Sequence, residues 1–165
     1  MVSRLVPYKN LDVIIKAFNT LKHRKLIVVG SGPLLTYLKN LASKNVEFLG
    51  FVEDKMLTDL MSRAKALIFS AEEDFGIIPV EAQAAGTPVI AYKRGGVTES
   101  VIENSTGIFY EENTPQAIIN AIKRFEKIQD SFDPNVIRQN SLRFSKERFR
   151  KEFLAFLEKV LSRNV

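Results

Sequence analysis

The feature that most constrains this chain is a repeated alternation between two kinds of segment. Short apolar runs rich in β-branched residues are each followed by a stretch whose apolar residues recur at the 3.6-residue spacing of a helix. Strands and helices that alternate with short connections favour a parallel sheet covered by helices on both faces. We therefore predict an α/β fold: a doubly wound, Rossmann-like parallel sheet of about six strands, followed by C-terminal helices.

The periodicity also predicts where the elements lie. Strands are expected at Met1–Leu5, Lys25–Gly30, Val46–Leu49, Ala66–Ser70, Pro88–Tyr92 and Gly107–Tyr110. Helices are expected at 11–21, Leu34–Ala42, Lys55–Ala64, Pro79–Ala85, Thr98–Glu103, Pro115–Gln129, 136–142 and Lys146–Leu161. In a doubly wound sheet the ligand binds beyond the carboxyl ends of the strands. The loops that follow the strands are therefore where functional residues are expected.

Length and composition limit the classes of protein that fit. The chain has 165 residues, which suits one domain over 1–165, and its first strand has almost no lead-in. It thus resembles the second half of something larger. The absence of cysteine excludes disulfides, a thiolate nucleophile and thiolate metal sites, and a single histidine excludes histidine-rich metal sites. The apolar runs are too short for a membrane span, and a cytoplasmic location is expected.

Positive charge is concentrated at one end of the chain. The formal net charge is +5, and residues 138–163 contain eight Lys or Arg against three Glu, which equals the whole excess. Such a balance favours anionic partners such as nucleotides or an acidic membrane surface. The last predicted helix also has an apolar stripe beside basic residues. That stripe could pack against this domain or another one, or it could lie on a membrane surface.

The segment 71–91 is the most informative stretch. It contains a strand end, an acidic turn and a helix that we expect to enter through Pro79, with Glu81 in its first turn. The free amides of Gly76 to Ile78 and the helix dipole would attract an anion. Glu73 and Glu81 cannot bind phosphate, but carboxylates accept hydrogen bonds from hydroxyl groups. Phosphate flanked by hydroxyls describes a sugar nucleotide, whereas simple capping of the helix by acidic residues is the alternative.

Two cations bracket the first strand–helix turn. Arg4 could clasp phosphate oxygens and Lys9 could add a mobile charge, so that together they neutralise a diphosphate without a metal. A solvated loop is the alternative. The glycines of Gly30–Pro33 do not complete a dinucleotide fingerprint, because Leu35 stands where a third small residue is needed. Glu72–Asp74 lacks the Asp-x-Asp pattern, and no metal is expected.

Five motifs in this order resemble the C-terminal domain of the retaining glycosyltransferases of family 4. They are Ser3–Leu5 with Lys9, Gly30–Pro33, Val46–Val52, Glu73 with Glu81, and Gly95–Glu99. The resemblance runs from Met1 to about Leu161. The sequence of residues 71–84 is most similar to that of bacterial and archaeal mannosyltransferases of surface-polysaccharide assembly.

The resemblance implies one half of a GT-B architecture, with the nucleotide-sugar donor held between two Rossmann-like domains. Arg4 and Lys9 would hold the diphosphate, and Glu81 the ribose. Glu73, the candidate catalytic residue, would hold the transferred sugar together with the backbone of Phe75, Gly76 and Ile77. Val52 would lie against the base. The family usually has glycine where this chain has Asn10. The donor would be GDP-mannose or another NDP-sugar, with no bound metal, and the acceptor a saccharide or lipid-linked molecule.

The acceptor-binding N-terminal domain would be absent, so that this chain alone is expected to bind a nucleotide weakly and to transfer nothing. Peripheral contact with the inner face of a membrane fits the resemblance. Three other hypotheses stay open: a non-catalytic nucleotide or nucleotide-sugar binding module, a sugar-phosphate epimerase, and a nucleic-acid-binding protein. No aromatic–basic recognition motif supports the last of these, so we expect no nucleic acid partner.

Overall fold

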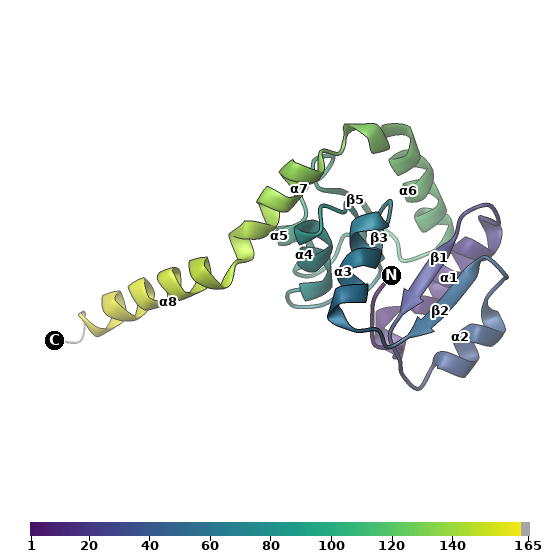
Figure 1. Ribbon diagram of the computed structural model, residues 1–165, viewed down its shortest axis with the longest axis horizontal. Coiled ribbons are helices and arrows are strands. Elements are labelled where there is room, and N and C mark those ends of the chain that lie inside the picture. Colours follow the sequence, from purple (N-terminus) through teal and green to yellow (C-terminus); the bar gives the residue numbers. More distant parts are fainter. Residues whose placement is uncertain (163–165) are drawn as a thin grey trace.

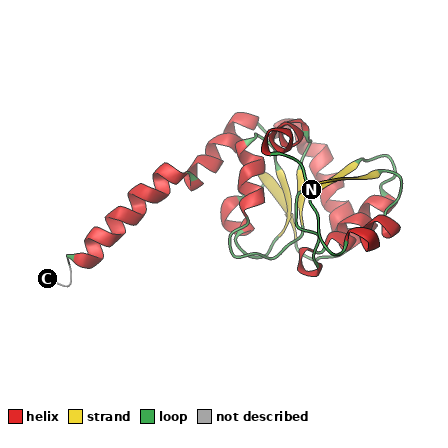
Figure 2. Ribbon diagram, turned by 60° about the horizontal axis from the view of Figure 1, so that its bottom comes forward, coloured by secondary structure: helices red, strands yellow, loops and turns green. Residues whose placement is uncertain are grey.

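A computed structural model describes residues 1–162 and shows parallel strands surrounded by helices (Figures 1 and 2). The strands are β1 (Leu26–Val29), β2 (Val46–Gly50), β3 (Leu67–Phe69), β4 (Val89–Tyr92) and β5 (Gly107–Tyr110). The α-helices are α1 (Leu11–Thr20), α2 (Leu35–Leu41), α3 (Asp54–Arg63), α4 (Ile77–Ala84), α5 (Val97–Ser100), α6 (Pro115–Ile128), α7 (Pro134–Ser141) and α8 (Lys146–Leu161). Short 3₁₀ turns lie at Pro7–Lys9, Gln129–Ser131 and Leu142–Phe144. Arg163, which contributes to the basic tail, lies outside the described residues.

The predicted parallel α/β organisation is confirmed, but the sheet is divided. Over residues 1–162 the strands form two parallel sheets, β1–β2 and β3–β4–β5, so that there are five strands rather than about six. The predicted strand Met1–Leu5 is wrong as an element. It forms a single parallel bridge from Val2 to Val29 and then hydrogen-bonds through Leu5 to Ser31. Proline at position 7 and a 3₁₀ turn follow at once, which leaves little chain for a longer ladder.

Alternation along β3, β4 and β5 separates two hydrophobic cores. Ile68, Ile90 and Ile108 belong to the core that contains α1 and α6. Their sequence neighbours Leu67, Phe69, Val89, Ala91 and Phe109 belong to the other core, with Ala82 of α4 and Met61 of α3. Successive side chains of a strand point to opposite faces of the sheet. The sheet is therefore covered on both faces, as the alternation of elements predicts.

Two pairs of glycines let loops pack directly on other backbone. A Cβ on Gly30 would lie 1.9 Å from the carbonyl oxygen of Ser3, and one on Gly32 would lie 2.5 Å from that of Leu5. A Cβ on Gly95 would lie 2.3 Å from the carbonyl oxygen of Glu73. The glycines after β1 thus allow the N-terminal segment to approach, and those after β4 hold the loop after β3.

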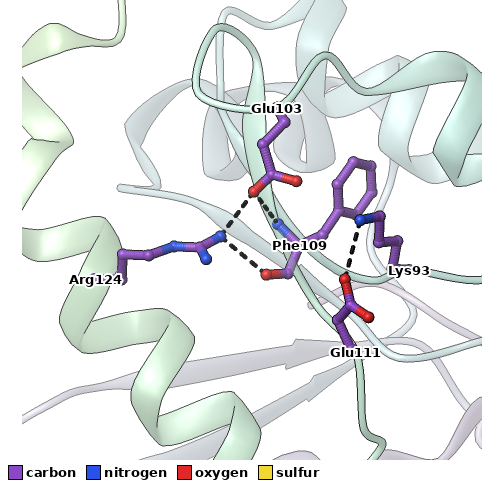
Figure 3. Close-up of polar contacts among 5 residues, drawn as sticks. All are labelled: Lys93, Glu103, Phe109, Glu111 and Arg124. Atoms are coloured by element: carbon purple, nitrogen blue, oxygen red, sulfur yellow. Dashed lines mark hydrogen bonds and ion pairs between the residues drawn. The ribbon is translucent and has the colours of Figure 1, made fainter.

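The outer edge of β5 is closed by side chains rather than by another strand (Figure 3). A carboxylate oxygen of Glu103 accepts a hydrogen bond from the amide of Phe109 (3.3 Å) and one from Arg124 (2.8 Å). Arg124 also donates to the carbonyl oxygen of Phe109 (2.9 Å). Both backbone groups of Phe109 that point away from β4 are therefore paired. An open edge with free amides and carbonyls invites pairing with another chain, and these two side chains prevent it.

Helix α8 extends away from the body of the molecule in both views (Figures 1 and 2). Its position agrees with the prediction of a helix at Lys146–Leu161, and the Ser145 side chain caps it by accepting from the amide of Arg148. All its described residues are exposed, including Phe149, Phe153 and Phe156. Its apolar stripe is therefore not covered by any other part of residues 1–162. Within residues 1–162 no helix is sufficiently long and apolar to span a bilayer.

Candidate functional site

The loops at the carboxyl ends of the strands bring together Lys9 and Glu73. Lys9 ends the 3₁₀ turn that precedes α1, and Glu73 lies in the loop between β3 and α4. Their side chains form an ion pair with only 15% and 21% of their surfaces exposed. The lysine ammonium also lies 4.9 Å from the ring centre of Tyr8. A cation predicted to hold phosphate and a carboxylate predicted to hold sugar hydroxyls are thus direct neighbours.

Arg4 is placed differently from Lys9. It is exposed in the loop that leads to the 3₁₀ turn, and its guanidinium forms no hydrogen bond or ion pair with any residue from 1 to 162. A guanidinium that is free of partners can bind an anion without first breaking an ion pair. Lys9, in contrast, would have to exchange Glu73 for a phosphate oxygen.

Helix α4 begins two residues earlier than predicted. Its first residue is Ile77, so that Pro79 is the third residue of the helix and Glu81 lies in the second turn. Gly76 precedes the helix with φ +79°, a conformation that a residue with a side chain rarely adopts, and this turn lets the helix start before the proline. The amides of Gly76, Ile77 and Ile78 donate to no other part of the chain within the described residues. They therefore form a free helix N-terminus beside Glu73.

The other predicted contacts occupy the surroundings of this helix start. Phe75 is half exposed and packs edge-on against Phe144, with 5.5 Å between the ring centres. Ile77 is exposed, and Val52 follows β2 in a partly buried position. Phe51 beside it is 81% exposed, although it is a large aromatic residue. The exposure of Phe51 was not predicted, because a phenylalanine after a strand ordinarily signals the core.

The carboxyl group of Glu81, on α4, has a raised pKa. Partial burial raises the pKa of its carboxyl group above the ordinary value, and the nearby carboxylate of Asp54 raises it further. Two acidic side chains, one at the start of α3 and one on α4, thus lie close together, and neither forms an ion pair with a residue from 1 to 162. Such an arrangement suits a ligand with hydroxyl or N–H donors.

We expect a Glu81→Gln substitution to stabilise the fold slightly at pH 7. A carboxyl group with a raised folded-state pKa opposes folding above that pKa, and the penalty disappears as the pH falls below the unfolded value. The gain at pH 7 should stay within about 0.5 kcal/mol because the side chain is largely solvated. Urea unfolding at pH 7 and at pH 4 measures it. A gain that is as large at pH 4 as at pH 7 would contradict this origin.

A buried polar network lies beneath the Lys9–Glu73 pair. The Ser70 hydroxyl is 2.5 Å from the phenol oxygen of Tyr110, which donates to the carbonyl oxygen of Phe69 (3.1 Å). The Asn10 side chain donates to the carbonyl oxygen of Ser70 (3.1 Å). Sequence reasoning missed this network. An Asn where the family usually has glycine was the available signal, because Asn tolerates the left-handed conformation that the structure shows (φ +53°).

Two cavities lie away from this edge of the sheets. One of about 790 Å³ opens between β1 and β3 and is lined by residues at the amino ends of the strands, such as Leu26, Ala66 and Thr87. A shallower one of about 480 Å³ lies beside His23 and Lys44. Neither includes a predicted site residue. The described residues contain no cluster of three or more His, Asp or Glu side chains arranged to hold a metal ion.

A parallel α/β domain whose strands are covered by helices on both faces has a Rossmann-like fold, in which ligands generally bind beyond the carboxyl ends of the strands. Comparison with known proteins specifies the family. Residues 1–142 match the family model of the glycosyl transferases group 1, and the chain belongs to this family. This result confirms the resemblance to retaining GT-B glycosyltransferases.

Individual relatives agree with this assignment. An uncharacterised glycosyltransferase of Methanocaldococcus jannaschii is 34% identical over 132 residues, which are 74% of this chain and 34% of that protein. A GDP-mannose-dependent alpha-(1-6)-phosphatidylinositol monomannoside mannosyltransferase of Mycobacterium tuberculosis is 32% identical over 138 residues, covering 73% of this chain and 36% of the relative. The structure of Anabaena Alr3699/HepE with UDP and glucose aligns with a TM-score of 0.76 and 26% identity, over 95% of this chain and 47% of that chain. The chain thus spans about a third of the length of these curated relatives.

Proposed function

We propose that this domain binds the nucleotide-sugar donor of a retaining glycosyltransferase. The single observation that carries the proposal is the Lys9–Glu73 ion pair beside the free amides of α4. A bound donor would replace the Lys9–Glu73 ion pair by two new interactions, one with each residue. Its diphosphate would interact with Lys9, Arg4 and the backbone of Phe75, Gly76 and Ile77, and its sugar hydroxyls would donate to Glu73.

The nucleoside is assigned to the neighbouring surface. Glu81 would accept hydrogen bonds from the ribose hydroxyls, and the base would lie beside Val52. GDP-mannose is the donor that the mannosyltransferase relative supports, whereas the Anabaena structure supports a uridine nucleotide. The proposal therefore specifies an NDP-sugar as the donor class. We propose that no metal takes part, because Arg4 and Lys9 supply the positive charge that a diphosphate needs.

Transfer to a saccharide or a lipid-linked acceptor would need a second domain. Because the positioning of both reactants contributes several kcal/mol to catalysis, one side of a cleft cannot supply it. The uncovered apolar stripe of α8 supports a contact with such an N-terminal Rossmann-like domain, since a stripe of this width normally packs against another surface. The isolated chain is expected to bind the donor and to transfer no sugar.

Ligand-induced stabilisation tests the proposal. We expect one of GDP, UDP or ADP, or its hexose conjugate, to raise the melting temperature of the chain, both with magnesium and with EDTA. A ligand at 100 times its dissociation constant adds about 2.7 kcal/mol to the free energy of unfolding. An Arg4→Ala variant should lose most of the shift, whereas Arg63→Ala, on the exposed end of α3, should retain it. Equal shifts in both variants, or no shift with any nucleotide, would contradict the assignment of the site.

A further inference from the structure

The Ser70–Tyr110 network joins the segments that bear Lys9 and Glu73. Ser70 follows β3 directly and lies three residues before Glu73. Its carbonyl oxygen accepts from the side chain of Asn10, the residue after Lys9. Its hydroxyl meets Tyr110 at the end of β5. One serine thus connects the Lys9 turn, the Glu73 loop and the far strand of the sheet.

The direction of the hydrogen bonds follows from the groups themselves. The carbonyl oxygen of Phe69 can only accept, so the Tyr110 phenol donates its proton to that oxygen. The Ser70 hydroxyl must therefore donate, either to the phenol oxygen at 2.5 Å or to the Asn113 side chain at 3.4 Å. Burial raises the pKa of Tyr110, which keeps the phenol protonated and the bond to Phe69 intact.

The packing of β5 does not require the hydrogen bonds of this network. The Tyr110 ring belongs to the apolar core and stacks on Tyr92 at 5.9 Å, and a phenylalanine would preserve both contacts. Only the hydroxyl distinguishes tyrosine from phenylalanine, and this hydroxyl forms its hydrogen bonds with the end of β3 rather than with the core. A buried polar network that is fully paired fixes one arrangement of the groups around it.

We propose that Tyr110 is a positioning residue, which acts through Ser70 and Asn10 to hold the Lys9 turn and the Glu73 loop at the separation that a nucleotide-sugar needs. The inference rests on the proposed function. Without the phenol hydroxyl, Ser70 loses its fixed orientation. The end of β3 and the Asn10 side chain that donates to it then lose their fixed positions, and the Lys9–Glu73 ion pair loosens.

A double-mutant cycle tests this role in the 165-residue chain, with affinities for GDP-mannose and UDP-glucose measured by calorimetry well below the melting temperatures. Tyr110→Phe should weaken binding of the preferred donor about tenfold, within the range of coupling seen between residues of one network. In a Lys9→Ala background the same substitution should change the affinity about twofold or less. The control is Tyr92→Phe, which removes a hydroxyl from the stacked partner ring and should leave the affinity unchanged.

Hydrogen exchange supplies a second measurement that needs no ligand. Tyr110→Phe should speed exchange of the amides of Lys9, Asn10 and Gly96, which donate to the carbonyl oxygens of Val6, Pro7 and Glu73, while β4 keeps its protection. Tyr92→Phe should leave the exchange of all these amides unchanged. A lower melting temperature with unchanged affinity and unchanged exchange of these three amides would reduce Tyr110 to a structural residue. Equal losses of affinity with and without Lys9 would also overturn the inference. Failure of the wild-type chain to bind either donor saturably would overturn the proposed function, and this inference with it.

Discussion

A Gly96→Ala variant is expected to lose about 3 kcal/mol of folding free energy. The added methyl group would lie 2.2 Å from the carbonyl oxygen of Asp74 and 2.6 Å from the Cα of Phe75. All three nearest atoms are backbone, so no side chain can rotate to make room. Forcing extra volume into packed structure costs about 1–3 kcal/mol. The loop that bears Glu73 must therefore shift, and donor affinity should fall with stability. Urea unfolding monitored by circular dichroism gives the first quantity, and calorimetry the second.

Gly50→Ala is the matched control for this loss. Gly50 has φ +72°, but no atom lies within 4 Å of the position of its Cβ. Alanine there should lose only the conformational term of a left-handed residue, about 1–2 kcal/mol. A Gly96→Ala variant that is as stable as Gly50→Ala would show that the loop after β3 yields to the methyl group. The packing of this loop against Gly95 and Gly96 would then not hold Glu73 in its position.

Replacement of Lys9 by methionine is expected to weaken donor binding about 10- to 100-fold, because a hydrogen bond between charged groups contributes about 1.5–3 kcal/mol. Methionine retains the length of the aliphatic chain beside Tyr8 but has no charge. Glu73 would lose its ion-pair partner while largely buried, so that the free energy of unfolding should also decrease. Calorimetric titration with the preferred NDP-sugar measures the first effect, and denaturant unfolding the second.

Lys93→Met provides the control for charge alone. Lys93 pairs with Glu111 at 3.0 Å on the surface, where both side chains are well exposed (Figure 3). Its removal changes the net charge of the chain by the same amount as removal of Lys9. An equal loss of donor affinity in the two variants would mean that the overall positive field, and not a direct contact of Lys9, attracts the nucleotide.

Much of the fold could be predicted because its signals are local. Helix α8 and strand β5 have the predicted bounds, and α6 differs by one residue at its end. Their starts are marked by a glycine at the first residue of β5 and by capping side chains, Thr114 before α6 and Ser145 before α8. The start of α4 could not be predicted from Pro79. The positive φ of Gly76 lets the helix begin before the proline, and backbone conformation at a single glycine leaves no periodic signal. The segment Met1–Leu5 contains apolar residues that predict a strand, but the turn after it limits its pairing to one bridge.

The site shows the same division between local and long-range information. Lys9 and Glu73 occupy loops at the same edge of the sheets. This position follows from the parallel order of the strands, because the carboxyl ends of parallel strands meet at one edge. Their ion pair and the Ser70–Tyr110 bond join residues 64 and 40 positions apart, and such contacts depend on side-chain geometry after folding. Neither residue pair has a spacing that sequence periodicity could reveal.

The closed edge of β5 has a consequence for association between copies of the chain. A strand that added to this edge would need the amide and the carbonyl of Phe109, and Glu103 and Arg124 already hold both. Sheet extension of the kind that builds fibrils would therefore first have to break both hydrogen bonds to the backbone of Phe109. Glu103 and Arg124 thus protect the domain from open-ended polymerisation at this edge of the sheet.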